Sequence, residues 1–134
     1  MAIRVELQRR SFGEKERLVA EGAGLSVSAF RYDSGIEALR LRNRRGECII
    51  LPFKGQQIWS ANFDGREIGM RSMFREPVAT ERYLETYGAF FIHCGVTAIG
   101  APGPEDDHPL HGELPSAPYQ RCLLYTSPSP RDTR

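Results

Sequence analysis

Apolar and polar residues alternate along much of this chain, which is the pattern of half-buried β-strands. Alternation is clearest over residues 3–7, 25–29 and 39–42, where every second position is leucine, isoleucine, valine or alanine. The run 48–51 is apolar without a break, which predicts a strand buried on both faces. We therefore expect an all-β protein with mostly antiparallel strands.

Turn-forming residues separate these runs. The segment 43–46, Asn-Arg-Arg-Gly, predicts a hairpin turn, and Asp64-Gly65 is a strong two-residue hairpin signal. Segments 56–63 and 66–70 are predicted as the strands on either side of that second turn. Successive antiparallel strands follow from this spacing.

Helical signals are few. Residues 80–87 predict one short helix, with Thr80 as its N-cap and Gly88 at its end. Residues 13–20 have a weaker pattern that is compatible with a turn of helix. The segment 95–107 is rich in glycine and proline and is predicted as a loop. No internal repeat divides the chain.

Composition narrows the class of protein. The chain has 134 residues, of which 40% are hydrophobic and 26% charged, as in one folded domain. Its 18 basic and 17 acidic residues give a net charge of +1 without a basic cluster, so we expect no nucleic-acid partner. Residues 1–10 lack the apolar core of a signal peptide, and no run is long enough to span a membrane. The near-neutral charge and the lack of a signal peptide predict a cytoplasmic protein that binds a small molecule. We expect no membrane partner, and the sequence does not predict the oligomeric state.

The last residues are expected not to belong to the natural protein. Residues 122–132, Cys-Leu-Leu-Tyr-Thr-Ser-Pro-Ser-Pro-Arg-Asp, match residue for residue the translation of a transposase sequencing adapter. We therefore interpret 1–121 as the N-terminal part of a single domain and 122–134 as a non-native tail. Without the two arginines and one aspartate of that tail, the formal net charge falls from +1 to zero.

Two cysteines remain outside the tail. Cys48 and Cys94 lie in apolar stretches, so buried free thiols are the preferred interpretation and a disulfide has no support. His93 neighbours Cys94, but adjacent residues of a strand point to opposite faces, so they are not expected to form a nucleophile and base pair. No phosphate-binding glycine loop is present, and we expect no cofactor.

His111 is the strongest candidate for contact with a substrate. It lies between Pro109 and Gly112 in an acidic, glycine-rich loop. A histidine titrates near neutral pH and both donates and accepts hydrogen bonds, while a glycine beside it leaves room for a ligand. His108 stands three residues earlier, but the intervening proline opposes the helical turn that would align the pair, and we expect no metal.

Other residue types suggest carbohydrate chemistry. Glycosidases use a pair of carboxylates for catalysis, and the three acidic residues 105–107 are candidates for such a pair. A solvated acidic loop is the preferred interpretation. Trp59, the single tryptophan, either packs in the core or stacks on a sugar ring. If Ile58 faces the core, Gln57 and Trp59 face a cleft together.

Four motifs in this order resemble the N-terminal half of an aldose 1-epimerase-like protein, from an uncharacterised branch of the galactose mutarotase-like superfamily. They are Leu51-Pro52-x-x-Gly55-Gln56-Gln57-Ile58-Trp59, Phe63-Asp64-Gly65-Arg66, Tyr87-Gly88-x-Phe90-x-x-x-Cys94-Gly95 and His108-Pro109-Leu110-His111-Gly112-Glu113-Leu114-Pro115-x-Ala117-Pro118-Tyr119. The resemblance covers about residues 36–120. It implies part of a β-supersandwich, in which large antiparallel sheets pack face to face.

The resemblance also implies a mechanism. In mutarotases a carboxylate takes the proton of the anomeric hydroxyl while a histidine protonates the ring oxygen, so that the sugar opens and recloses as the other anomer. Leu110-His111-Gly112 is similar to the first histidine motif of the family, which gives His111 a role in sugar binding. Glu113 stands where better-known members have a second glycine, and it is a candidate to bind a hydroxyl or an arginine. The family's upstream Asn-Arg pair has no counterpart near Cys94.

We therefore expect a small-molecule sugar as ligand, with His111, Glu113, Gln57 and Trp59 as substrate-binding residues. The general acid and base of the family lie beyond position 121, so no complete catalytic set is expected here and the chain itself is expected to be inactive. The parent protein is interpreted as an aldose 1-epimerase-like isomerase. The alternatives are a non-catalytic carbohydrate-binding or regulatory protein on the same fold, and a sugar-active lyase or hydrolase. A partial sandwich is also expected to expose apolar faces and strand edges.

Overall fold

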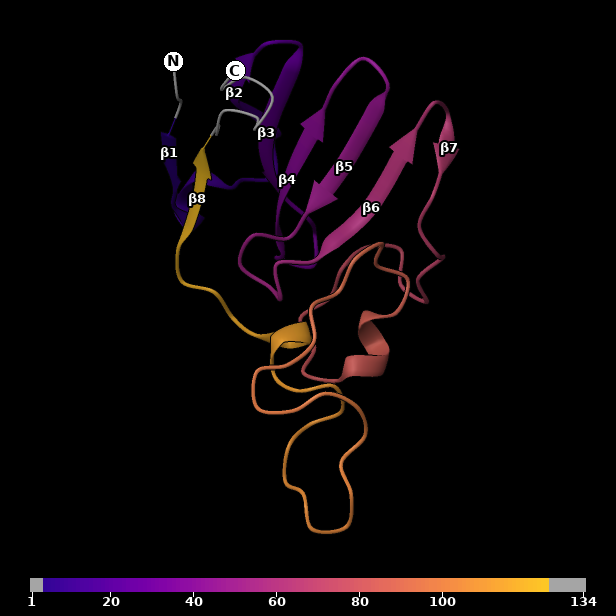
Figure 1. Ribbon diagram of the computed structural model, residues 1–134. Coiled ribbons are helices and arrows are strands. Elements are labelled where there is room, and N and C mark those ends of the chain that lie inside the picture. Colours follow the sequence, from indigo (N-terminus) through magenta and orange to yellow (C-terminus); the bar gives the residue numbers. More distant parts are fainter. Residues whose placement is uncertain (1–3, 126–134) are drawn as a thin grey trace, which may run out of the picture.

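The protein consists of two antiparallel sheets and a long segment with little regular structure (Figure 1). The computed structural model describes residues 4–125. The strands are β1 (Arg4–Leu7), β2 (Arg17–Gly22), β3 (Leu25–Arg31), β4 (Glu37–Arg42), β5 (Gly46–Ile50), β6 (Ile58–Phe63), β7 (Arg66–Glu67) and β8 (Cys122–Tyr125). Helical structure within the described residues is limited to three 3-10 turns, η1 (Arg9–Ser11), η2 (Tyr83–Thr86) and η3 (Leu114–Ser116). The prediction of an all-β protein is confirmed.

The larger sheet is a meander of six strands, β2 to β7, that pair in the order of the sequence. Its hairpins use the turn residues that the sequence indicated: Asn43 donates its backbone N–H to Gly46 at 2.9 Å, and Asp64 and Gly65 have φ of 52° and 74°. A third tight hairpin, at Ala23 and Gly24, joins β2 to β3 with the same positive φ angles. The prediction of a helical turn over residues 13–20 is wrong, because residues 17–20 belong to β2.

Side chains from the central strands enter two apolar clusters, one on each face of the large sheet. Leu39 belongs to the first cluster and its neighbour Ala38 to the second, as expected for adjacent residues of a strand. The first cluster is covered by β1 and β8, and also takes in Phe12 and Phe53, whose rings meet edge to face at 5.4 Å. The uninterrupted apolar run of β5 is explained by this burial on both faces. The full supersandwich stays a prediction.

The smaller sheet pairs β1 with β8, with Val5 opposite Leu124. The residues of β8 come from the segment that we interpret as adapter-derived. Pairing of strands uses backbone groups, which any sequence supplies, so the strand is compatible with that interpretation and does not test it. The rest of the predicted tail, and Ile3 of the first predicted strand, lie outside the described residues.

Three predicted elements are shorter than expected. The strand predicted over 66–70 ends at Glu67. The helix predicted over 80–87 is the single 3-10 turn η2; Thr80 does accept a backbone hydrogen bond, from Arg82 at 3.0 Å. The strand predicted from residue 56 begins instead at Ile58, because Gln56 has a positive φ of 45°. None of the helical turns within residues 4–125 has the length and hydrophobicity needed to cross a bilayer.

The segment between β7 and β8 lies beyond the end of the sheet where β5 ends and β6 begins (Figure 1). It is held there by backbone hydrogen bonds, from Ile58 to the carbonyl of Phe91 at 3.0 Å and from Gly55 to that of Ala117 at 2.8 Å. Its first part reaches the turn between β3 and β4, where the backbone N–H of Ser34 donates a hydrogen bond to the Glu76 carboxylate at 2.8 Å.

The closest approach within the large sheet gives a test of the β5–β6 pairing. A Cβ atom at Gly46 would lie 2.0 Å from the carbonyl oxygen of Asn62, so we expect Gly46→Ala to lower the free energy of unfolding by about 1–3 kcal/mol. Gly13→Ala is the matched control, because nothing lies within 4 Å of its Cβ position. Chemical denaturation measures both variants. Equal stability of the two variants would contradict this register.

Candidate functional site

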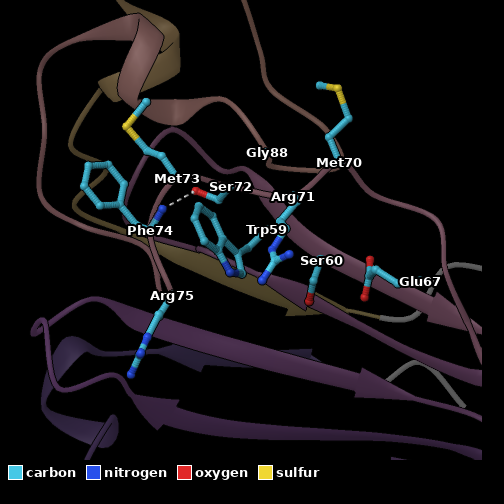
Figure 2. A pocket seen from close by; sticks show the side chains of 10 residues that line it. All are labelled: Trp59, Ser60, Glu67, Met70, Arg71, Ser72, Met73, Phe74, Arg75 and Gly88. Atoms are coloured by element: carbon cyan, nitrogen blue, oxygen red, sulfur yellow. Dashed lines mark hydrogen bonds between the residues drawn. The ribbon is translucent and has the colours of Figure 1, made fainter.

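The described residues form a polar hollow of about 350 Å³ on one face of the large sheet. Its floor is the start of β6, with Trp59 and Ser60, and its wall is the segment from Met70 to Arg75 (Figure 2). Glu67 closes one end. The hollow therefore lies between a strand of the sheet and a loop, an arrangement typical of ligand sites.

Trp59 forms the aromatic part of the floor. The β5–β6 register shifts between Ile49 and Ile50, so that Ser60 pairs with Ile49 while Ile58 pairs with Ile50. Trp59 is the extra residue of this bulge, and its ring packs partly against the apolar cluster on this face. Core packing of Trp59 is therefore confirmed in part, and its stacking on a sugar ring stays a prediction.

Glu67 positions the turn that encloses the hollow. One carboxylate oxygen, Oε1, accepts backbone hydrogen bonds from Ala61 at 3.3 Å and from Gly69 at 3.1 Å. Within residues 4–125 the other oxygen has no hydrogen-bond partner. Glu67 thus combines a structural role with one free acceptor at the hollow.

The wall is fixed by close packing at its middle. Gly88 lies against Ser72, and a Cβ atom at Gly88 would be 2.3 Å from the Cα of Ser72. The Ser72 hydroxyl also accepts a hydrogen bond from the backbone N–H of Phe74 at 3.1 Å (Figure 2). These contacts hold the loop in place while Arg71 extends toward Trp59 and Ser60.

His111, the strongest candidate from the sequence, lies outside this hollow. Its ring packs on Tyr83 with centroids 4.4 Å apart, and its Nδ1 is buried without a hydrogen-bond partner among the described residues. The backbone φ of His111 is 60°, an uncommon conformation for a residue with a side chain. Its role in sugar binding stays a prediction.

Tyr83 connects His111 to the edge of the hollow. Burial, together with the neighbouring hydroxyl of Tyr87 and thiol of Cys94, raises the pKa of Tyr83 to about 12. The Tyr83 and Tyr87 rings meet edge to face at 5.5 Å, and Tyr87 immediately precedes Gly88. Tyr83 is therefore a neutral hydrogen-bonding residue at physiological pH.

The glycine after His111 has a different role from the one that the sequence suggested. A Cβ atom at Gly112 would lie 2.4 Å from the carbonyl oxygen of Gly95 and 2.5 Å from that of Ala98. The absence of a side chain at Gly112 therefore makes room for the backbone of the same loop. The expectation that it makes room for a ligand is wrong.

Gln57 is buried and does not share a cleft with Trp59. Its side chain is 1% exposed and its Nε2 donates a hydrogen bond to the carbonyl of Pro115 at 2.7 Å. The expected alternation fails because residues 56 and 57 precede the strand and the bulge follows. This hydrogen bond links two of the motifs that carry the family resemblance, residues 51–59 and residues 108–119.

Glu113 is bound within its own loop. Its carboxylate accepts backbone hydrogen bonds from Val96 at 3.0 Å and Thr97 at 3.2 Å, and a further one from the Thr97 hydroxyl. The Thr97 hydroxyl and these amides lower the pKa of Glu113 to about 2. The hydroxyl that Glu113 binds in this structure is therefore that of Thr97, a residue of the protein itself.

The remaining candidates are dispersed. His108 lies 3.8 Å from Asp106, but among residues 4–125 no three histidine, cysteine or acidic side chains gather as metal ligands do. Asp106 itself accepts a hydrogen bond from the backbone of Gly103 at 2.8 Å. Cys48, Cys94 and Cys122 carry free thiols, each partly exposed.

Ser60, Glu67 and Arg71 are the residues that sequence reasoning missed. Alternation places Ser60 on the polar face of β6, which was a usable signal. Glu67 and Arg71 lie at and beyond the end of the short strand β7, where no periodic pattern marks which face a side chain takes. A scan against protein-family models and searches of curated proteins and of solved structures found no match to this chain.

The pKa of Glu113 gives a test of the loop around His111. Its pKa is lower in the folded protein than the ordinary 4.5, so the ionised carboxylate stabilises the loop above about pH 4.5 and this stabilisation is lost as the pH falls toward 2. We expect the backbone amide signals of Val96 and Thr97 to titrate with a midpoint near 2 in NMR spectra. Glu113→Gln is expected to abolish that titration. A midpoint near 4.5 would show that these hydrogen bonds do not form.

Proposed function

We propose that the chain binds a sugar in the hollow at Trp59, and that the protein to which it belongs is an aldose 1-epimerase-like isomerase. The observation that carries the proposal is an aromatic ring at the floor of a polar hollow. The flat apolar side of a sugar ring packs on an aromatic face, while its hydroxyl groups need donors and acceptors around the rim.

The rim of the hollow supplies both hydrogen-bond donors and hydrogen-bond acceptors. Ser60 both donates and accepts, the second oxygen of Glu67 accepts, and Arg71 donates. A hollow of about 350 Å³ falls within the ordinary size range of small-molecule sites. Sugar binding is thus the function that this arrangement of side chains supports best.

The isomerase part of the proposal rests on the motif resemblance alone. Two of those motifs, 51–59 and 108–119, pack on each other through the bond from Gln57 to Pro115, so they form one structural unit. This packing is compatible with the resemblance.

Trp59 is the single tryptophan, so its fluorescence reports on the hollow directly. We expect simple aldoses to change its emission in a saturable way. In calorimetry Trp59→Ala should weaken binding by at least about tenfold, a loss of about 1.4 kcal/mol, while Trp59→Phe should retain most of the affinity because it keeps an aromatic face.

The matched control is Leu84→Ala, which removes an exposed apolar side chain from η2, outside the hollow. This control should bind as the unchanged chain does. Retention of full affinity by a folded Trp59→Ala variant would contradict the proposed site, and its folding is checked by circular dichroism.

A further inference from the structure

We propose that the sugar bound in this hollow carries an anionic group, a carboxylate or a phosphate, and that Arg71 is its partner. The inference rests on the proposed function and adds the class of sugar. The observation behind this inference is the arrangement of charged side chains around the hollow.

Arg71 is a cation that the protein itself leaves without an acidic partner. Within residues 4–125 its guanidinium forms no ion pair, and Figure 2 shows it directed toward Trp59 and Ser60. Glu67, the acidic residue that lines the same hollow, already accepts two backbone hydrogen bonds at Oε1. A guanidinium beside an aromatic floor is thus available to a ligand.

The surface around the hollow carries an excess of positive charge, the same sign as the charge of Arg71. A second hollow of about 420 Å³ adjoins the first, since both are lined by Ser60 and Glu67. The two hollows together are lined by five arginines and two glutamates, whereas the whole chain has a net charge of only +1. Positive charge is therefore concentrated on this face of the sheet.

Part of that charge is neutralised within the protein. Arg42 pairs with Glu47 at 2.8 Å, and Arg45 pairs with Asp64. Arg44, Arg71 and Arg75 have no acidic partner within ion-pair distance in the part of the chain that the structure describes. A cleft with excess charge of one sign raises the local concentration of ligands of the opposite sign.

The chemistry of arginine narrows the ligand further. Its planar guanidinium donates two parallel hydrogen bonds to a carboxylate or a phosphate, which a hydroxyl group cannot match. An acidic group attached to the sugar ring would reach Arg71 while the ring stays on Trp59. A uronate and a sugar phosphate share this chemistry, so the test includes both.

The test compares sugars that differ only in charge. Calorimetry on the full chain measures glucose, glucuronate, glucose 6-phosphate and the cationic glucosamine, with inorganic phosphate as the probe for an anion alone. We expect at least one anionic sugar to bind about tenfold or more tightly than glucose, and glucosamine to bind less tightly. The tighter of the two anionic sugars identifies the acidic group.

Arg71→Gln should remove this preference, so that the ratio of the affinity for the anionic sugar to the affinity for glucose falls to about one, while glucose itself loses only the neutral hydrogen bond that Arg71 donates. Arg17→Gln is the control, because Arg17 is exposed on β2 and lines neither hollow. Equal affinity for glucose and both anionic sugars would overturn the inference and leave sugar binding intact. Binding of phosphate as tight as that of glucose 6-phosphate, or retention of the preference in Arg71→Gln, would also overturn it. Failure of every sugar to bind would overturn both proposals.

Discussion

The burial of β4 and β5 on both faces is the constraint on which the rest of this structure depends. Ala38 and Leu39 are neighbours in β4 that point to opposite faces, and their exposed fractions are 0% and 3%. A strand whose two faces are both apolar requires a covering layer on each side.

The two faces are covered differently. On one face, β1 and β8 and the rings of Phe12 and Phe53 close over the apolar cluster. On the other face, Tyr32 and Trp59 pack against the apolar cluster, and the loop from Met70 to Arg75 lies beside Trp59 and Ser60. This loop leaves a gap beside the start of β6, and polar side chains line that gap. The hollow is a consequence of how this face of the sheet is covered.

Much of the fold could be predicted from the sequence because the strands obey local rules. Alternation located β1, β3 and β4, and the Asp64-Gly65 pair located a hairpin, since only a few residue types accept its positive φ angles. The helix over 80–87 failed because eight residues without a long apolar stripe have little intrinsic helical stability. There the tertiary packing decides the structure.

The candidate site was less predictable for a related reason. His111 was chosen for its chemistry and its neighbours, but the bulge at Trp59 and the long segment between β7 and β8 determine which side chains meet. Gln57 illustrates the difficulty: spacing of two residues implied a shared face, and the late start of β6 removed that implication. Arg71 lies in the irregular segment after β7, where no periodic pattern fixes the direction of a side chain.

The central claim is that the ligand site lies at the hollow beside the start of β6. Mapping of amide chemical shifts by NMR during titration with glucuronate tests it most directly. The account predicts changes concentrated in residues 59–61 of β6 and in residues 67–75, with the remainder of the sheet unaffected. Changes confined to the loop of His111 and its partner Tyr83, with none at Trp59 or Arg71, would contradict the account.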